Sequence, residues 1–324
     1  MHRLPELHRL IEKAFSEAAF NRDPMQLYQP ISYTLELGGK RLRPALVLLS
    51  CELFGGEIGK AIFPAMGVEI FHNFTLLHDD IMDNAPIRRG HPTVHRKWDI
   101  NTAILSGDTM FVIAYEYVAK TDPTLLPAVL DLFNDTARKV CEGQQYDMDY
   151  ETREDVTIDE YMIMIRLKTA VLIACSLKLG ALVAGTEPGL ANRIYDMGIE
   201  LGLAFQLRDD YLDAFGEAGK FGKAIGGDIA TNKKTYLYLK AFETARGETA
   251  GRLRHVFSDP VPHAEQKINT VIRLYKELGI DTLTRKEIAL HHDRAMEILH
   301  SFGFNEKLTV ELIHLMEEML GREK

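Results

Sequence analysis

The sequence predicts an all-α protein, and three features of its pattern support this. Apolar residues recur at steps of three and four along most of the chain, which places them on one face of a helix. Runs of alternating β-branched residues, which favour strands, are nearly absent. With 324 residues, of which 46% are hydrophobic, the chain can bury a large core.

Four segments show the helical periodicity most clearly, at residues 4–20, 68–83, 194–215 and 308–320. Short breakers containing proline separate the periodic segments, at residues 121–127, 185–189 and 258–263. None of these breakers is long or of low complexity, so we predict one all-α domain over residues 1–324. The most apolar stretch, residues 169–186, contains Lys178, which favours a buried helix over stable membrane insertion.

Charge and cysteine content argue against several classes of protein. A net charge of −9 disfavours nucleic-acid binding, although local basic clusters could hold anionic ligands. The first residues of the chain include acidic side chains and lack an apolar core, which argues against a secretory signal peptide. Three widely spaced cysteines, Cys51, Cys141 and Cys175, indicate reduced thiols and a cytoplasmic protein.

Two clusters of aspartates carry the main functional signal. Each cluster has three aspartates at helical spacing: Asp79, Asp80 and Asp83 in the first, and Asp209, Asp210 and Asp213 in the second. Residues three and four apart share a helix face, so we expect each set of carboxylates to converge beside one turn. One cluster alone could be a charged helix face, but two within apolar helices favour metal binding. Such hard oxygen ligands favour magnesium or calcium, and six carboxylates in two groups would suit several magnesium ions shared with a diphosphate.

Basic residues near the first cluster predict a phosphate site. Lys40, Arg41 and Arg43 follow a pair of glycines and precede an apolar run, as in anion sites at helix starts. A solvated basic turn is the alternative. Arg88 and Arg89 come directly after the first aspartate cluster, and arginine can bind phosphate oxygens in a bidentate manner.

Further polar and basic residues along the chain are candidates for the same site. His72 lies seven residues before Asp79 and shares its helix face, although a lone helix histidine is more often structural. Gln206 lies three residues before the second cluster, and Lys168 and Thr169 are adjacent polar residues in an apolar region. The segment 216–234 combines glycines with lysines, including Lys223 and Lys233. It lacks the end of a P-loop, so we predict a mobile lid that carries lysines to phosphate, or a plain flexible loop.

The ordered set of motifs resembles the trans-isoprenyl diphosphate synthases of the polyprenyl synthetase family. The segments that carry the resemblance are GGKRLRP (38–44), LLHDDIMDNAPIRRG (76–90), LKTA (167–170), FQLRDDYLDAFG (205–216) and GKAIGGDIATNKKTY (222–236). The resemblance implies a helical bundle around a deep central cavity, usually in a homodimer. It also implies head-to-tail condensation of an allylic diphosphate with isopentenyl diphosphate, with both acting as small-molecule substrates.

The same resemblance implies a role for each motif residue. The six aspartates would hold Mg²⁺ against the allylic diphosphate, and Arg88, Lys168, Lys223 and Lys233 would neutralise that group. The diphosphate of isopentenyl diphosphate would bind Lys40, Arg43, His72 and Arg89. Thr169 and Gln206 would border the reacting carbons. The C-terminal tail, where family members often carry basic residues, receives no role.

Residues upstream of the first cluster bear on product length. In the family, an aromatic residue at the fifth position upstream marks short-chain enzymes, and here that residue is Phe74, with Phe71 a turn further away. Thr75, at the fourth position, is not aromatic, and the two-residue insertion of common bacterial farnesyl synthases is missing. The pattern most resembles a geranylgeranyl diphosphate synthase, with farnesyl diphosphate synthase as the alternative. A terpene cyclase or a non-catalytic partner subunit fits less well, because both aspartate motifs are complete.

Overall fold

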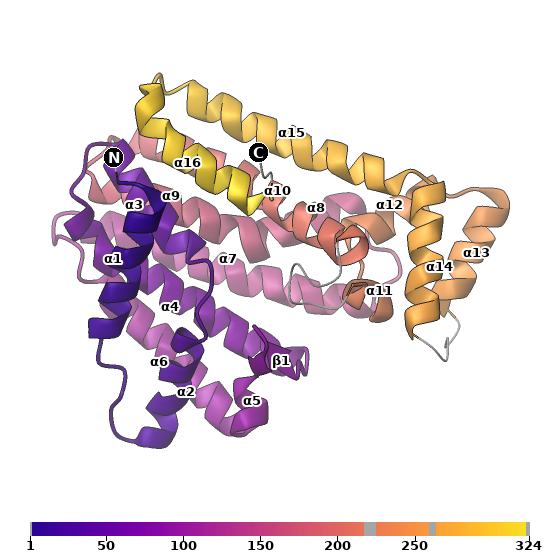
Figure 1. Ribbon diagram of the computed structural model, residues 1–324, viewed down its shortest axis with the longest axis horizontal. Helices are drawn as coiled ribbons and strands as arrows, with labels where there is room; N and C mark the ends of the chain where they lie inside the picture. Colours follow the sequence, from indigo (N-terminus) through magenta and orange to yellow (C-terminus); the bar gives the residue numbers. More distant parts are fainter. Residues whose placement is uncertain (1, 217–224, 259–263, 322–324) are drawn as a thin grey trace. The chain divides into compact units, whose positions relative to one another are not determined.

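The computed structural model describes residues 2–216, 225–258 and 264–321 (Figure 1). Helices dominate these ranges, which confirms the predicted all-α class. The elements of the first half are α1 (Leu4–Glu17), α2 (Met25–Glu36), α3 (Leu42–Leu53), α4 (Ile58–Met82), β1 (Ile87–Arg88), β2 (His91–Pro92), α5 (Val94–Lys97), α6 (Ile100–Val118) and α7 (Leu126–Thr152). Those of the second half are α8 (Ile158–Ile165), the π-helix η1 (Arg166–Ala170), α9 (Val171–Val183), α10 (Pro188–Phe215), α11 (Gly227–Ala230), α12 (Tyr236–Thr244), α13 (Gly247–Ser258), α14 (Ala264–Glu277), α15 (Ile280–His300) and α16 (Glu306–Met319).

The chain forms two compact units. The first unit consists of residues 1–135, 172–195 and 302–324, and the second of residues 136–171 and 196–301. The single domain over the whole chain that the sequence predicts stays a prediction.

In the first unit, α4 packs against both α3 and α6. Helix α3 is apolar around most of its surface, and residues 45–49 are completely buried, as expected for a helix in the middle of a core. Gly67 of α4 lets α6 approach closely, because a Cβ there would lie 2.7 Å from Val118 Cγ2. Helix α4 is therefore held on two sides, and it carries the first aspartate motif at its C-terminal end.

A two-residue hairpin follows the first aspartate motif. In the pairing of β1 with β2, Arg88 lies opposite His91. The residues that connect the strands, Arg89 and Gly90, have φ angles of 53° and 77°. Two positive φ angles are characteristic of the tight turn that matches the twist of antiparallel strands. The hairpin thus presents two adjacent arginines close in sequence to the aspartates.

In the second unit, a π-helical segment interrupts the path from α8 to α9. The segment η1 is flanked by two helical glycines: a Cβ at Gly143 of α7 would lie 2.2 Å from Lys168 N. A Cβ at Gly202 of α10 would lie 2.4 Å from Ala170 Cα. Such π-helical turns are rare and are frequent at functional sites. The two glycines allow neighbouring helices to approach the backbone that carries Lys168 and Thr169.

The four predicted helical segments correspond to α1, α4, α10 and α16, with some differences at their ends. The apolar stretch 169–186 forms the last residues of η1 and all of α9, as predicted for a buried helix, and Lys178 Nζ donates a hydrogen bond to Asn192 Oδ1. Among the helices that the structure describes, none combines the length and the apolar character needed to cross a membrane.

Candidate active site

The first aspartate motif is held by an arginine of the hairpin. Asp80 is buried, and its Oδ1 accepts hydrogen bonds from Arg88 Nε at 2.9 Å and Arg88 Nη2 at 2.6 Å. Arg88 Nη2 also lies 3.6 Å from Asp79 Oδ2. Burial raises the pKa of Asp80, as does the neighbouring charge of Asp79, and Arg88 offsets only part of this. Arg88 therefore contacts two of the three carboxylates of the motif.

The adjacent arginine points to a different cluster. Arg89 Nη1 donates hydrogen bonds to Gly38 O and, at 3.5 Å, to Asn73 Oδ1. A Cβ on Gly39 would lie 2.9 Å from Arg89 Cζ, so the glycine leaves room for the guanidinium. Arg88 and Arg89 thus serve two separate groups, the aspartates and the loop of residues 38–41, which we call the glycine loop.

His72 lies near Arg43, which follows the glycine loop, and near Arg89 of the hairpin. Burial lowers its pKa well below the usual value for histidine, and the charges of Arg43 and Arg89 lower it further. The imidazole is therefore neutral at pH 7 and can offer a hydrogen bond without another positive charge. Lys40 is exposed on the same loop. The four residues predicted to bind isopentenyl diphosphate all belong to the first unit.

The second aspartate motif sits in a polar network within the second unit. Asp210 is buried; its Oδ2 accepts a hydrogen bond from the Tyr161 hydroxyl, and its Oδ1 accepts one from Gln206 Nε2 at 3.0 Å. Burial and the charge of Asp228 raise the pKa of Asp210 to about 7. Asp213 Oδ2 accepts a hydrogen bond from the backbone N–H of Asp228 at 3.0 Å.

Thr169 joins the same network. Its Oγ1 donates a hydrogen bond to Gln206 Oε1 at 2.8 Å, and Gln206 Nε2 donates one to Asp210 Oδ1. The sequence predicted that both residues border the reacting carbons, and this stays a prediction. The structure adds that Thr169 orients the amide of Gln206, which leaves the amide nitrogen directed at Asp210.

A buried aspartate brings together two of the predicted lysines. Asp147 Oδ2 lies 2.6 Å from Lys168 Nζ and 3.3 Å from Lys233 Nζ. Burial by itself would raise the pKa of Asp147, but Lys233 and Lys168 hold it below its usual value. Lys168 comes from η1, whereas Lys233 follows Asn232, whose φ is 60°. Lys223 lies outside the described residues.

Several residues that contact the predicted site residues were not predicted from the sequence. Asp147 could have been found, because Gly143 one helical turn earlier is a glycine inside a long helix and signals close approach of another backbone. Glu69 is a charged residue within an apolar helix, and buried carboxylates require a partner. Tyr161 and Asp228 carry no such signal, since only the fold brings them to Asp210.

The predicted convergence of each set of carboxylates on a metal ion stays a prediction. Within residues 2–216, 225–258 and 264–321, no three acidic, histidine or cysteine side chains are grouped to hold a metal ion. In the first motif Arg88 holds Asp80, and Asp83, which follows α4, is exposed. In the second, Tyr161 and Gln206 hold Asp210, and Asp209 is exposed.

The residues present nevertheless fit magnesium. Burial and neighbouring carboxylates raise the pKa of both Asp80 and Asp210. A cation beside either carboxylate would therefore favour its ionised form. Magnesium commonly uses one or two protein carboxylates and completes its octahedron with phosphate oxygens and water. A closed set of three protein ligands is therefore not required.

An aromatic cluster lies upstream of the first motif on α4. The Phe74 ring centroid is 5.2 Å from that of Phe111 and 5.5 Å from that of Phe71. Phe71 is completely buried and also packs against Phe133, at 5.3 Å, whereas Phe74 is half-buried. Thr75 Oγ1 donates a hydrogen bond to His72 O at 2.8 Å. Of the three predicted chain-length residues, Phe74 is therefore the aromatic one with an accessible surface.

Comparison with known proteins gives the family of the chain. The model of the family described as polyprenyl synthetase matches residues 24–275. A short chain isoprenyl diphosphate synthase of Methanothermobacter thermautotrophicus is 37% identical over 95% of both chains. A geranylgeranyl diphosphate synthase of Methanosarcina mazei is 40% identical over 72% of both chains. The crystal structure of a geranylgeranyl pyrophosphate synthase has a TM-score of 0.94 and 42% identity, with all of both chains covered. The chain belongs to the polyprenyl synthetase family.

Proposed function

We propose that the protein is a magnesium-dependent, short-chain trans-prenyltransferase. It condenses an allylic diphosphate with isopentenyl diphosphate and releases diphosphate. This proposal rests on two adjacent arginines whose side chains contact different groups: Arg88 contacts the aspartates, and Arg89 contacts the glycine loop. Two separate anion-binding clusters suit two different diphosphate substrates, whereas a terpene cyclase needs only one.

Geranylgeranyl diphosphate is the proposed main product. The similarity to geranylgeranyl diphosphate synthases, at 40% identity for the Methanosarcina mazei protein, supports this assignment. The half-buried Phe74 upstream of the first motif supports it as well, because an aromatic ring there would limit the space for a longer chain. Farnesyl diphosphate is the alternative product.

The chemistry follows from the charges of the motif residues. Bound magnesium would neutralise the charge that develops on the departing diphosphate. Arg88 would donate hydrogen bonds to the allylic diphosphate, and Lys168 and Lys233 would serve the same purpose. Asp147 would keep the two lysines charged and close together until the substrate arrives.

Carbon–carbon bond formation requires few groups beyond these. When the allylic carbon–oxygen bond breaks, the isopentenyl double bond attacks the resulting cation. The new cation then loses a proton, and the released diphosphate is the proposed base. The Thr169 hydroxyl and Gln206 carbonyl dipoles would stabilise the allylic cation, and exclusion of water would protect it. Lys40, Arg43, His72 and Arg89 would hold the isopentenyl diphosphate.

The proposed function is tested by assaying the purified protein with isopentenyl diphosphate and an allylic primer. Diphosphate release should require both substrates, EDTA should abolish it, and excess magnesium should restore it. Release from the allylic diphosphate alone would indicate a cyclase. No release under any condition would indicate a non-catalytic subunit. Chromatography of the prenyl product, with dimethylallyl, geranyl and farnesyl diphosphates as primers, identifies the chain length.

We also propose that the protein forms a homodimer through α6. This helix exposes four large apolar residues, Ile100, Ile104, Leu105 and Val112, with exposed fractions between 40% and 59%. Several large exposed apolar residues on one helix support an interaction surface. Light scattering at assay concentrations should give the mass of two chains, and the mass of one chain would contradict the proposal. The cytoplasmic location stays a prediction.

A further inference from the structure

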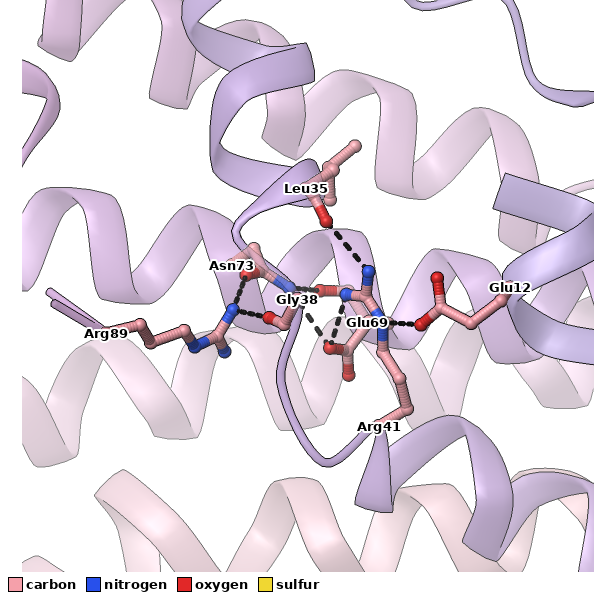
Figure 2. A network of polar contacts seen from close by, with 7 residues as sticks. All are labelled: Glu12, Leu35, Gly38, Arg41, Glu69, Asn73 and Arg89. Carbon is pink, nitrogen blue, oxygen red and sulfur yellow. Dashed lines mark hydrogen bonds and ion pairs between the residues drawn. The ribbon is translucent and has the colours of Figure 1, made fainter. Parts of the chain in front are cut away.

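Arg41 behaves differently from its basic neighbours. The sequence groups it with Lys40 and Arg43, but its guanidinium points into the first unit and only 4% of the residue is exposed (Figure 2). Arg41 Nη2 donates to Leu35 O at 2.8 Å, and Nη1 donates to Glu69 Oε1 at 3.1 Å. Its Nε donates to Glu12 Oε1 at 2.8 Å. These contacts leave Arg41 in the protein interior, where it anchors the end of the glycine loop.

Glu69 extends this anchor along α4. It is 2% exposed, and its Oε1 also accepts a hydrogen bond from Asn73 Nδ2 at 3.2 Å. Asn73, one turn later on the same helix face, directs its Oδ1 at Arg89 Nη1. Arg89 in turn donates to Gly38 O at the start of the glycine loop. The network therefore links both ends of the loop, as Figure 2 shows.

The backbone of the glycine loop needs such support. Gly38, Gly39 and Arg41 have φ angles of 72°, 142° and 46°. Arg41 is not a glycine, and a positive φ costs about 1–2 kcal/mol for an ordinary residue, so side-chain contacts must hold it. The two acceptors in the interior, Leu35 O and Glu69 Oε1, bind different nitrogens of one guanidinium and supply this restraint.

We propose that Glu69, with Arg41 and Asn73, positions the glycine loop and Arg89 to receive the diphosphate of isopentenyl diphosphate. The inference rests on the proposed function, and it assigns these three as positioning residues that do not contact the substrate. Glu69 is central because it is the one residue of the network that contacts both Arg41 and Asn73. It also places a negative charge beside cations that would repel one another before the substrate binds.

The experiment measures steady-state kinetics for both substrates in the Mg²⁺-loaded protein. Glu69→Gln keeps the shape of the side chain but removes its charge, and Asn73→Ala removes the contact to Arg89. Each should raise KM for isopentenyl diphosphate about tenfold, the effect of losing one hydrogen bond to a charged group. KM for the allylic substrate should stay within about twofold of wild type, because Arg88 and the aspartates lie outside the network. Arg89→Lys provides a benchmark for direct loss of a substrate contact.

Glu12→Gln is the matched control. Glu12 also pairs with Arg41, but its side chain is 55% exposed, and the contacts of the described residues do not link it to Asn73 or Arg89. Water can replace this partner, so both KM values should remain near wild type. If the network served only the stability of α3 and α4, Glu69→Gln would lower the unfolding temperature without changing KM for isopentenyl diphosphate.

Several outcomes would overturn the inference. A lower KM for isopentenyl diphosphate in Glu69→Gln would show that Glu69 repels the substrate rather than positioning its ligands. Equal rises in both KM values, or unchanged values in a folded variant, would also overturn it. If Glu69→Gln does not fold, Asn73→Ala alone tests the inference, because it leaves the ion pair between Glu69 and Arg41 intact. A wild-type protein without isopentenyl-dependent turnover would contradict the proposed function instead.

Discussion

Asp79→Ala should reduce kcat by about two to three orders of magnitude, the effect of removing one group that stabilises transition-state charge. Asp79 is the better target within the first motif because Asp80 accepts two hydrogen bonds from Arg88. Loss of Asp80 would leave Arg88 without this partner, and the activity change would then mix catalysis with local structure. The side chain of Asp79 is 18% exposed, so it can reach a magnesium ion shared with the substrate.

The measurement is single-turnover product formation at saturating magnesium and substrates, accompanied by thermal unfolding. Asp131→Ala is the matched control, because it removes the same charge from an exposed position on another helix, α7. It should retain full turnover. Asp209→Ala, which alters an exposed carboxylate of the second unit, should resemble Asp79→Ala. Near-normal turnover in either active-site variant would contradict the assignment of that aspartate as a metal ligand.

Phe74→Ala should lengthen the prenyl product. Phe74 lies about 7.5 Å along the helix axis from Asp79, at 1.5 Å per residue, close to the expected position of the growing chain. Its ring packs against Phe111 and Phe71 but remains half-buried. Truncation to alanine would open space beside α4, so the enzyme should add at least one further five-carbon unit. Chromatography of the products from one fixed primer measures this change.

Phe71→Leu is the control for simple packing effects. Phe71 is completely buried and contacts Phe133 as well as Phe74, so a smaller side chain should lower stability. The loss should be about 1–3 kcal/mol, below the 3–5 kcal/mol typical of Phe→Ala, with product length unchanged. A stable Phe74→Ala enzyme with wild-type products would show that the ring only fills the core.

The local pattern was enough to predict the helices and the identity of the motifs. Helix α4 could be predicted because its apolar residues recur at helical spacing, and that same spacing places His72 and Asp79 on one face. The apolar stretch that contains Lys178 was predicted to be a buried helix rather than a membrane span, and none of the described helices could cross a membrane. These features depend on neighbours three or four residues away, which any reader of the sequence can locate.

The partners of the motif residues were decided by the tertiary structure. Spacing alone does not indicate which of Arg88 and Arg89 contacts Asp80 and which contacts the glycine loop, although the family resemblance assigns them to different diphosphates. In the structure, the positive φ angle at Arg89 in the hairpin turn separates them. The arrangement of the carboxylates in each motif likewise depends on groups that pack beside the helix, such as Arg88 and Tyr161, which spacing along one helix does not include.

Arg41, whose guanidinium points into the protein interior, shows most clearly what the sequence alone does not determine. In the sequence it is one of three cations in GGKRLRP, and its neighbours offer no reason to distinguish it. In the structure Glu69 lies 28 positions later in the chain and still accepts its hydrogen bond. Sequence spacing determines which side chains share a helix face, whereas burial and long-range contacts decide which charges are satisfied inside the protein and which remain available to a substrate.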